Sequence, residues 1–202
     1  MGGIRYDEKV GRALLAGARR CLMNAVSTLD DAALLITEER VNRGFALAVL
    51  AQEEFSKCLL MANCVVQRRW DEEVFKSLIH HEKKQALVEI MLNYVSWFER
   101  KNSFALALNA TAFIPAPISH VPDPLEFQRW VDDAKRNVVK KRSIDHAKQR
   151  ALYVSVGADG VVSSEPCCTK QEAEAELDRA RSFQRVVEMQ LKYLDGTAGL
   201  RA

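Results

Sequence analysis

The chain has 202 residues, of which 48% are hydrophobic and 28% are charged, and its formal net charge is +2. This composition excludes a disordered chain, and the near-neutral charge balance favours no particular charged partner. The length fits a single domain, 1–202, that can bury a core of its own.

Cysteine usage and the chain start indicate a cytoplasmic protein. The five cysteines include no CxxC pair, and the stretch Met1–Val10 is polar. We therefore expect no secretory signal, no disulfide framework, no metal site and no cofactor. The most apolar window, Gly44–Val66, is interrupted by Glu53, Glu54 and Lys57, so we also expect no membrane-spanning segment.

Helical periodicity dominates the first half of the chain. Apolar residues recur every three to four positions and predict a first helix over about 6–30. A second helix follows from about 31 or 38 to 69. A third begins after Asp71, a good N-cap, and continues to about 101.

The second half alternates breaks and restarts. Four prolines predict an extended loop over 114–123, followed by a helix over 124–149. A β-rich run, a Gly-Ala-Asp-Gly turn and a valine pair predict a β-hairpin over 151–163. Thr169 and Glu172 form a capping box that opens a last helix over 169–195. The sequence thus predicts an all-α fold: an antiparallel helical bundle with a small β-hairpin inserted before the C-terminal helix.

Charged side chains lie in the middle of the most apolar helix. Glu54 and Lys57 share a face with Leu50 and Met61, and Glu53 is adjacent. Buried charges require partners. Two interpretations are open: an ion pair that fixes the packing, or a polar functional pocket.

The third helix supplies candidate partners for these charges. His81 lies on its apolar stripe, His80 precedes it, and Lys84 follows one turn later. The short connection after Arg68 predicts antiparallel neighbours, with Lys57 and His81 at nearly the same level. We therefore predict one polar cluster inside the bundle, in which Glu53 or Glu54, Lys57 and His80 or His81 are hydrogen-bonded to one another, with Lys84 as a further candidate. A satisfied core histidine remains the alternative for His81.

The fourth helix is strongly basic, which is typical either of a solvated face or of an RNA-binding surface. Its candidate RNA-binding residues are Lys135, Arg136, Lys140, Lys141 and Arg150. Arg142 and His146 are four positions apart and can share one surface. Together they could perform acid–base catalysis beside a phosphodiester, with the arginine stabilising the developing charge.

Three stretches resemble the AbiV family of bacterial abortive-infection proteins, a branch of the HEPN superfamily. The first is AVLAQEEFSK, ending at Lys57, which is similar to the family's E-E-x-x-K helix. The second is HHEKK, from His80 to Lys84, which is similar to its H-x-x-K helix. The third is KQRALYV, starting at Lys148, followed by a helix with the spacing A-x-x-x-L.

The resemblance implies a helical, dimeric domain that defends bacteria against phage by stopping growth or translation. Many HEPN relatives are metal-independent ribonucleases with an Arg-x4-6-His motif, whereas Arg142 and His146 have three residues between them. A ribonuclease acting through Arg142 and His146 is one hypothesis. A non-enzymatic module that binds a phage or host protein is the second, and a domain that binds a nucleotide or another anion is the third.

Overall fold

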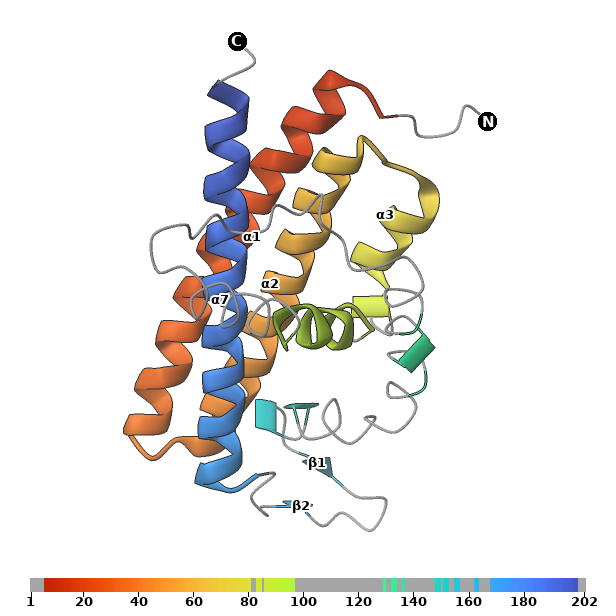
Figure 1. The fold of residues 1–202 in the computed structure, drawn as a ribbon. Helices are drawn as coiled ribbons and strands as arrows, with labels where there is room; N and C mark the ends of the chain where they lie inside the picture. Colours follow the sequence, from red (N-terminus) through yellow and green to blue (C-terminus); the bar gives the residue numbers. More distant parts are fainter. Residues whose placement is uncertain are drawn as a thin grey trace.

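The computed structural model describes the chain at residues 6–80, 83–84, 86–96, 129, 132–133, 136, 148–149, 151–152, 155–156, 162–163 and 168–199. Its named elements are the helices α1 (Glu8–Thr37), α2 (Val41–Gln67), α3 (Glu72–Ile79) and α7 (Lys170–Gly199) and the strands β1 (Ser155–Val156) and β2 (Val162–Ser163). Residues 86–96 are also helical. The prediction of a helical fold is confirmed (Figure 1). Within the described residues, no helix is both long and apolar enough to cross a membrane.

Helices α1 and α2 form a tight helical hairpin. Asp7 caps α1 by accepting a hydrogen bond from the Val10 amide at 2.7 Å. The predicted boundary at 30–31 is wrong, because α1 continues to Thr37. The turn occurs at residues 38–40, where Glu39 adopts a left-handed backbone with φ of 59°. No proline or glycine occupies this turn, which is why the sequence left its position open.

The predicted third helix is divided in two. Asp71 is its N-cap, as expected, and accepts from the Val74 amide at 3.0 Å. The helix α3 ends at Ile79, however, and His80 has an extended backbone. The helical segment 86–96 then packs Met91 and Tyr94 into the core. No proline or glycine stands at this point, so the sequence carries no local signal for the break.

Helix α7 begins where the sequence predicts. The backbone amide of Thr169 donates a hydrogen bond to the Glu172 carboxylate at 2.7 Å, and the amide of Glu172 donates one to the Thr169 hydroxyl at 3.2 Å. These two bonds confirm the capping box. The helix passes through Gly196 and ends at Gly199, beyond the predicted end.

Ion pairs at its two ends fix the direction of α7. Lys170 pairs at 2.7 Å with Glu39, just after the C-terminal end of α1, and Asp195 pairs with Arg19 in the N-terminal half of α1. Helix α7 is therefore antiparallel to α1 and parallel to α2 (Figure 1). The prediction of an antiparallel bundle is wrong for α2 and α7, because the long chain between them removes the constraint that a short loop would impose.

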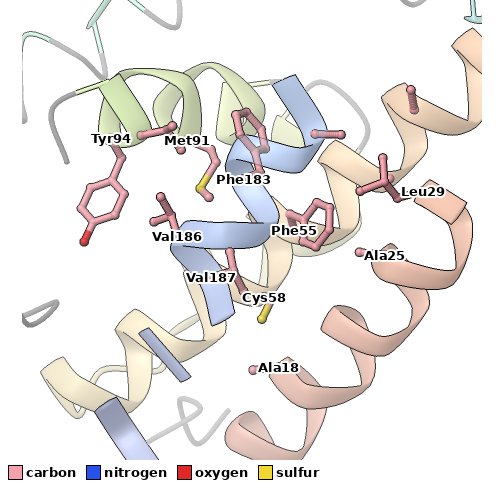
Figure 2. Packing of buried hydrophobic residues seen from close by; sticks show 14 of the residues in the cluster. Ala18, Ala25, Leu29, Phe55, Cys58, Met91, Tyr94, Phe183, Val186 and Val187 are labelled. Carbon is pink, nitrogen blue, oxygen red and sulfur yellow. The ribbon is translucent and has the colours of Figure 1, made fainter. Parts of the chain in front are cut away.

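The core lies where α1, α2, α7 and segment 86–96 meet. Small residues of α1, Ala18 and Ala25, face Phe55 and Cys58 of α2 (Figure 2). Phe183 of α7 lies between Phe55 and Met91 in the same view. Alanine on α1 permits the close approach of the helices, and the aromatic rings fill the space that remains.

The region before α7 contains a short strand pair. β1 and β2 run antiparallel, with Ser155 opposite Ser163 and Val156 opposite Val162. The predicted start of the hairpin is wrong, because Ala151 and Leu152 are helical. The described residues between 129 and 149 are also helical, within the helix predicted over 124–149. The proline-rich loop 114–123 and the turn 157–160 lie outside the described residues.

Candidate functional site

The two adjacent glutamates of α2 have different partners. Consecutive positions on a helix differ in direction by about 100°. Glu53 accepts a hydrogen bond at 2.6 Å from Nζ of Lys148, and both side chains are buried. Glu54 pairs instead with Lys57 on its own helix. The two neighbouring glutamates, each a candidate for the predicted cluster, therefore belong to two separate ion pairs.

The pair of Glu53 with Lys148 links distant segments. The two residues are 95 positions apart, and the side chain of Lys148 is only 6% exposed. A lysine at this depth loses its hydration, so its ammonium group must be stabilised by a carboxylate. The pair therefore fastens the chain at residue 148 to the middle of α2.

A second buried network joins α2 to α7. Nε2 of Gln52 donates to the backbone oxygen of Glu176 at 3.1 Å and to its carboxylate at 2.8 Å. Arg179 donates to the other carboxylate oxygen of Glu176 at 2.6 Å. Both oxygens of this buried carboxylate are thus occupied. Gln52 and Glu53 together make α2 the element to which the flanking segments are hydrogen-bonded.

The pair of Glu54 with Lys57 faces α1. Each side chain is about one-fifth exposed, and Glu54 lies near the thiol of Cys21 on α1. Burial and, secondly, the negative charge of Glu54 raise the pKa of Cys21 to about 11. Cys21 consequently remains a protonated donor at neutral pH, and not a reactive thiolate.

Of the third-helix candidates for this cluster, the structure describes His80 and Lys84. His80 is exposed at the end of α3, where its amide donates to the Lys76 carbonyl at 3.1 Å. Of the two alternatives, His80 or His81, the exposed position of His80 excludes His80 from a cluster inside the bundle. Lys84 is half-buried, and His81 lies outside the described residues.

The predicted basic surface is described at only one of its candidate residues. Arg136 is exposed and pairs with Asp133. Lys135, Lys140, Lys141, Arg142, His146 and Arg150 lie outside the described residues. Lys148 also belongs to this basic stretch, and its burial against Glu53 shows that part of the positive charge serves packing.

The arrangement can hold helices together, but its charged groups are neutralised. Glu53, Glu54 and Glu176 each have a cationic partner. In the described ranges, no group of three or more His, Cys, Asp and Glu side chains is placed to hold a metal ion. The geometry around α2 is therefore that of a structural polar core.

Sequence reasoning missed Gln52, Lys148 and Glu176 as members of this polar core. Gln52 was overlooked because the charged residues Glu53 and Glu54 follow it directly. Lys148 was overlooked as a buried residue because it stands among other basic residues. A usable signal was that Glu53 and Lys148 both fall in family-like stretches. Glu176 stands between Ala173 and Leu177, which are both buried on α7.

Comparison with known proteins gives one family. The family model HEPN_AbiV, described as AbiV, matches residues 13–185, which is most of the chain. No curated protein and no solved structure matches the chain. The match spans most of α1, all of α2 and the first half of α7, together with the buried partners Glu53, Lys148 and Glu176. The chain is therefore a member of the AbiV family of the HEPN superfamily.

Proposed function

We propose that this protein is an abortive-infection effector, which stops growth of a phage-infected bacterium by impairing RNA or translation. Family membership over residues 13–185 carries the proposal. The internal ion pair between Glu53 and Lys148 supports it, because it joins two of the stretches that resemble the family.

Phage challenge tests this role. Bacteria expressing the protein should form fewer plaques than bacteria with an empty vector, and infected cultures should stop growing before progeny phage appear. The matched control carries Arg181→Ala, which removes an exposed ion pair on α7 and should protect as well as the wild type. Unchanged growth and plaque formation across a phage panel would contradict the proposal.

The enzymatic form of the proposal is a metal-independent ribonuclease in which His146 exchanges protons with the RNA and Arg142 stabilises the developing charge. Purified protein should then cleave RNA with multiple turnovers in the presence of a chelator. His146→Ala and Arg142→Ala should each abolish cleavage, whereas Arg181→Ala should not. Full cleavage by His146→Ala would reject this assignment.

The alternative is a non-enzymatic module that binds a phage or host protein. Its support is that Glu53 and Glu54 of α2 are both engaged in ion pairs within the chain. Such a protein should inhibit cell-free translation in proportion to its concentration without degrading RNA. Catalytic loss of RNA at substoichiometric protein would exclude this alternative.

A further inference from the structure

Helix α3 exposes a row of apolar side chains. Phe75 is 41% exposed and Ile79 is 51% exposed, and the two lie one helical turn apart on the same face. Trp70, which is half-buried just before the helix, packs edge-on against Phe75 with the ring centroids 6.3 Å apart. We call Trp70, Phe75 and Ile79 the α3 row. Two of the five large hydrophobic residues that are exposed in the described part of the chain belong to it.

A different face of α3 attaches the helix to the bundle. Val74 is buried in the core, and Leu78, one turn later, is half-buried against it. In Figure 1, α3 lies at the edge of the molecule, on the other side of α2 from α7. Scattered apolar residues on a surface are ordinary, but a contiguous row of them is typical of an association surface. The α3 row is therefore a candidate docking surface.

The carboxylates beside the α3 row are neutralised within the chain. Asp71 pairs with Arg69 at 2.6 Å, and Glu73 pairs with the same arginine at 3.5 Å. Glu72 pairs with Lys76 at 2.6 Å. Each of these pairs is exposed and contributes little to stability, but it cancels the charge that its carboxylate would present to a partner.

Cations without a partner stand at both ends of the α3 row. Arg68 is exposed at the C-cap of α2, just before the row, and Lys83 is exposed just after it. The Lys84 amide donates to the His80 carbonyl at 3.0 Å, so the chain coils directly after α3 and Lys83 stays near the end of the row. Neither Arg68 nor Lys83 forms an ion pair in the part of the chain that the structure describes. The unpaired charge around the row is therefore positive.

We propose that the α3 row is the surface on which an acidic segment of another protein docks. Its apolar side chains cover Phe75 and Ile79, and its carboxylates pair with Arg68 and Lys83. Charge complementarity selects this occupant, because a basic segment would be repelled by the two unpaired cations. The proposal deepens the non-enzymatic alternative and rests on it, since it names the binding surface and the chemistry of the phage or host protein.

A peptide selection tests the docking on purified protein. From a yeast-displayed library of random sequences, the wild type should enrich peptides that combine acidic residues with large apolar side chains. Phe75→Glu and Ile79→Glu should each weaken binding of an enriched, fluorescein-labelled peptide by about tenfold or more, because each places a carboxylate against the acidic peptide. Arg68→Asn combined with Lys83→Gln should weaken binding by about tenfold and lower its salt dependence. Asparagine suits this position because it tolerates the left-handed backbone of Arg68.

The matched controls are Leu34→Glu and Lys9→Gln, which change an exposed apolar residue and an exposed cation of α1 and should bind the peptide as the wild type does. Enrichment of basic peptides, no enrichment, or equal binding to Phe75→Glu and Leu34→Glu would overturn the proposal. Cosedimentation with phosphatidylglycerol vesicles, or a doubled mass in light scattering, that Phe75→Glu abolishes while no peptide binds would assign the row to a lipid surface or a second copy, and would also overturn it. Circular dichroism checks that each variant is folded. Peptide binding is measured without phage, so its failure is distinct from a failure of phage protection.

Discussion

Lysine usually lies at the surface, but Lys148 is buried, and the free energy of burying its charge depends on its partner Glu53. With Glu53 as its carboxylate, the ammonium group is stabilised in a region from which water is largely excluded. Removing either charge alone leaves the other buried and uncompensated. The position of the chain at residue 148 is therefore stabilised by its ion pair with α2.

We expect Lys148→Met to lower the free energy of unfolding by about 3–5 kcal/mol, since it leaves the carboxylate of Glu53 unpaired. The double variant Glu53→Gln with Lys148→Met should recover most of that loss. Urea denaturation measures both. The control is Lys170→Met, which removes an exposed pair with Glu39 and should cost about 1 kcal/mol or less. Equal losses for Lys148→Met and Lys170→Met would contradict the buried pair.

The buried thiols make stability depend on pH. Burial raises the pKa of Cys58 from 9.0 to about 12 and that of Cys64 to about 11. Because the folded pKa values lie above the unfolded ones, the stabilisation is complete below pH 9 and is lost as pH rises from 9 toward 11 and 12. The loss is about 1.4 kcal/mol per pH unit for each thiol.

Replacement of Cys58 isolates its share of this effect. Cys58→Ala should be less stable than the wild type at pH 8, since it leaves a small cavity. The gap between the two proteins should narrow by about 1 kcal/mol at pH 10, because only the wild type must keep this thiol protonated. Urea denaturation under reducing conditions gives both values, and a constant gap would show that Cys58 does not titrate on unfolding.

At the scale of elements, glycine sets how closely α1 and α2 approach. A Cβ atom on Gly44 would lie 2.5 Å from Cγ1 of Ile36 and 2.9 Å from the backbone oxygen of Ala32. The backbone contact cannot be relieved by rotating a side chain. Gly44 therefore holds the end of the helical hairpin together, although glycine is a weak helix former.

We expect Gly44→Ala to lower the free energy of unfolding by about 1–3 kcal/mol, because the steric clash exceeds the gain in helix propensity. Gly196→Ala on α7 is the matched control. Its Cβ would meet nothing within 4 Å, so this variant should be more stable by about 0.5–1 kcal/mol. Thermal or urea unfolding compares the pair, and a stabilising Gly44→Ala would show that the helices separate at little cost.

For the whole molecule, the question is whether the pair of Glu54 with Lys57 serves the fold or the defence activity. The pair lies between α2 and Cys21 of α1, and the structure does not bring His80 to it. We expect the double variant Glu54→Gln with Lys57→Met to fold, to keep nearly wild-type stability and to protect bacteria from phage. Plaque counts beside urea denaturation measure this. A folded double variant without protection would assign the pair to the activity.

The helix starts could be predicted from residues that are close together in the sequence. The N-caps Asp71 and Thr169 were found because capping uses residues two or three positions apart. The helix break at His80 was missed, and the turn at Glu39 was left open between starts at 31 and 38, since neither place has a proline or glycine signal. The level of His81 was counted along a continuous helix, so the missed break removes the basis of that count, and the contribution of His81 to the cluster stays a prediction.

The sequence by itself determined the helical periods, the caps, the family-like stretches and the need for partners beside the charges of α2. Those properties depend on neighbours along the chain or on one helix face. Only the tertiary structure decided which partner each charge has: Lys148 for Glu53, Lys57 for Glu54 and Gln52 with Arg179 for Glu176. The reason is physical. Adjacent side chains on a helix point in directions about 100° apart, and the segments that meet each direction are set by the packing of the whole chain.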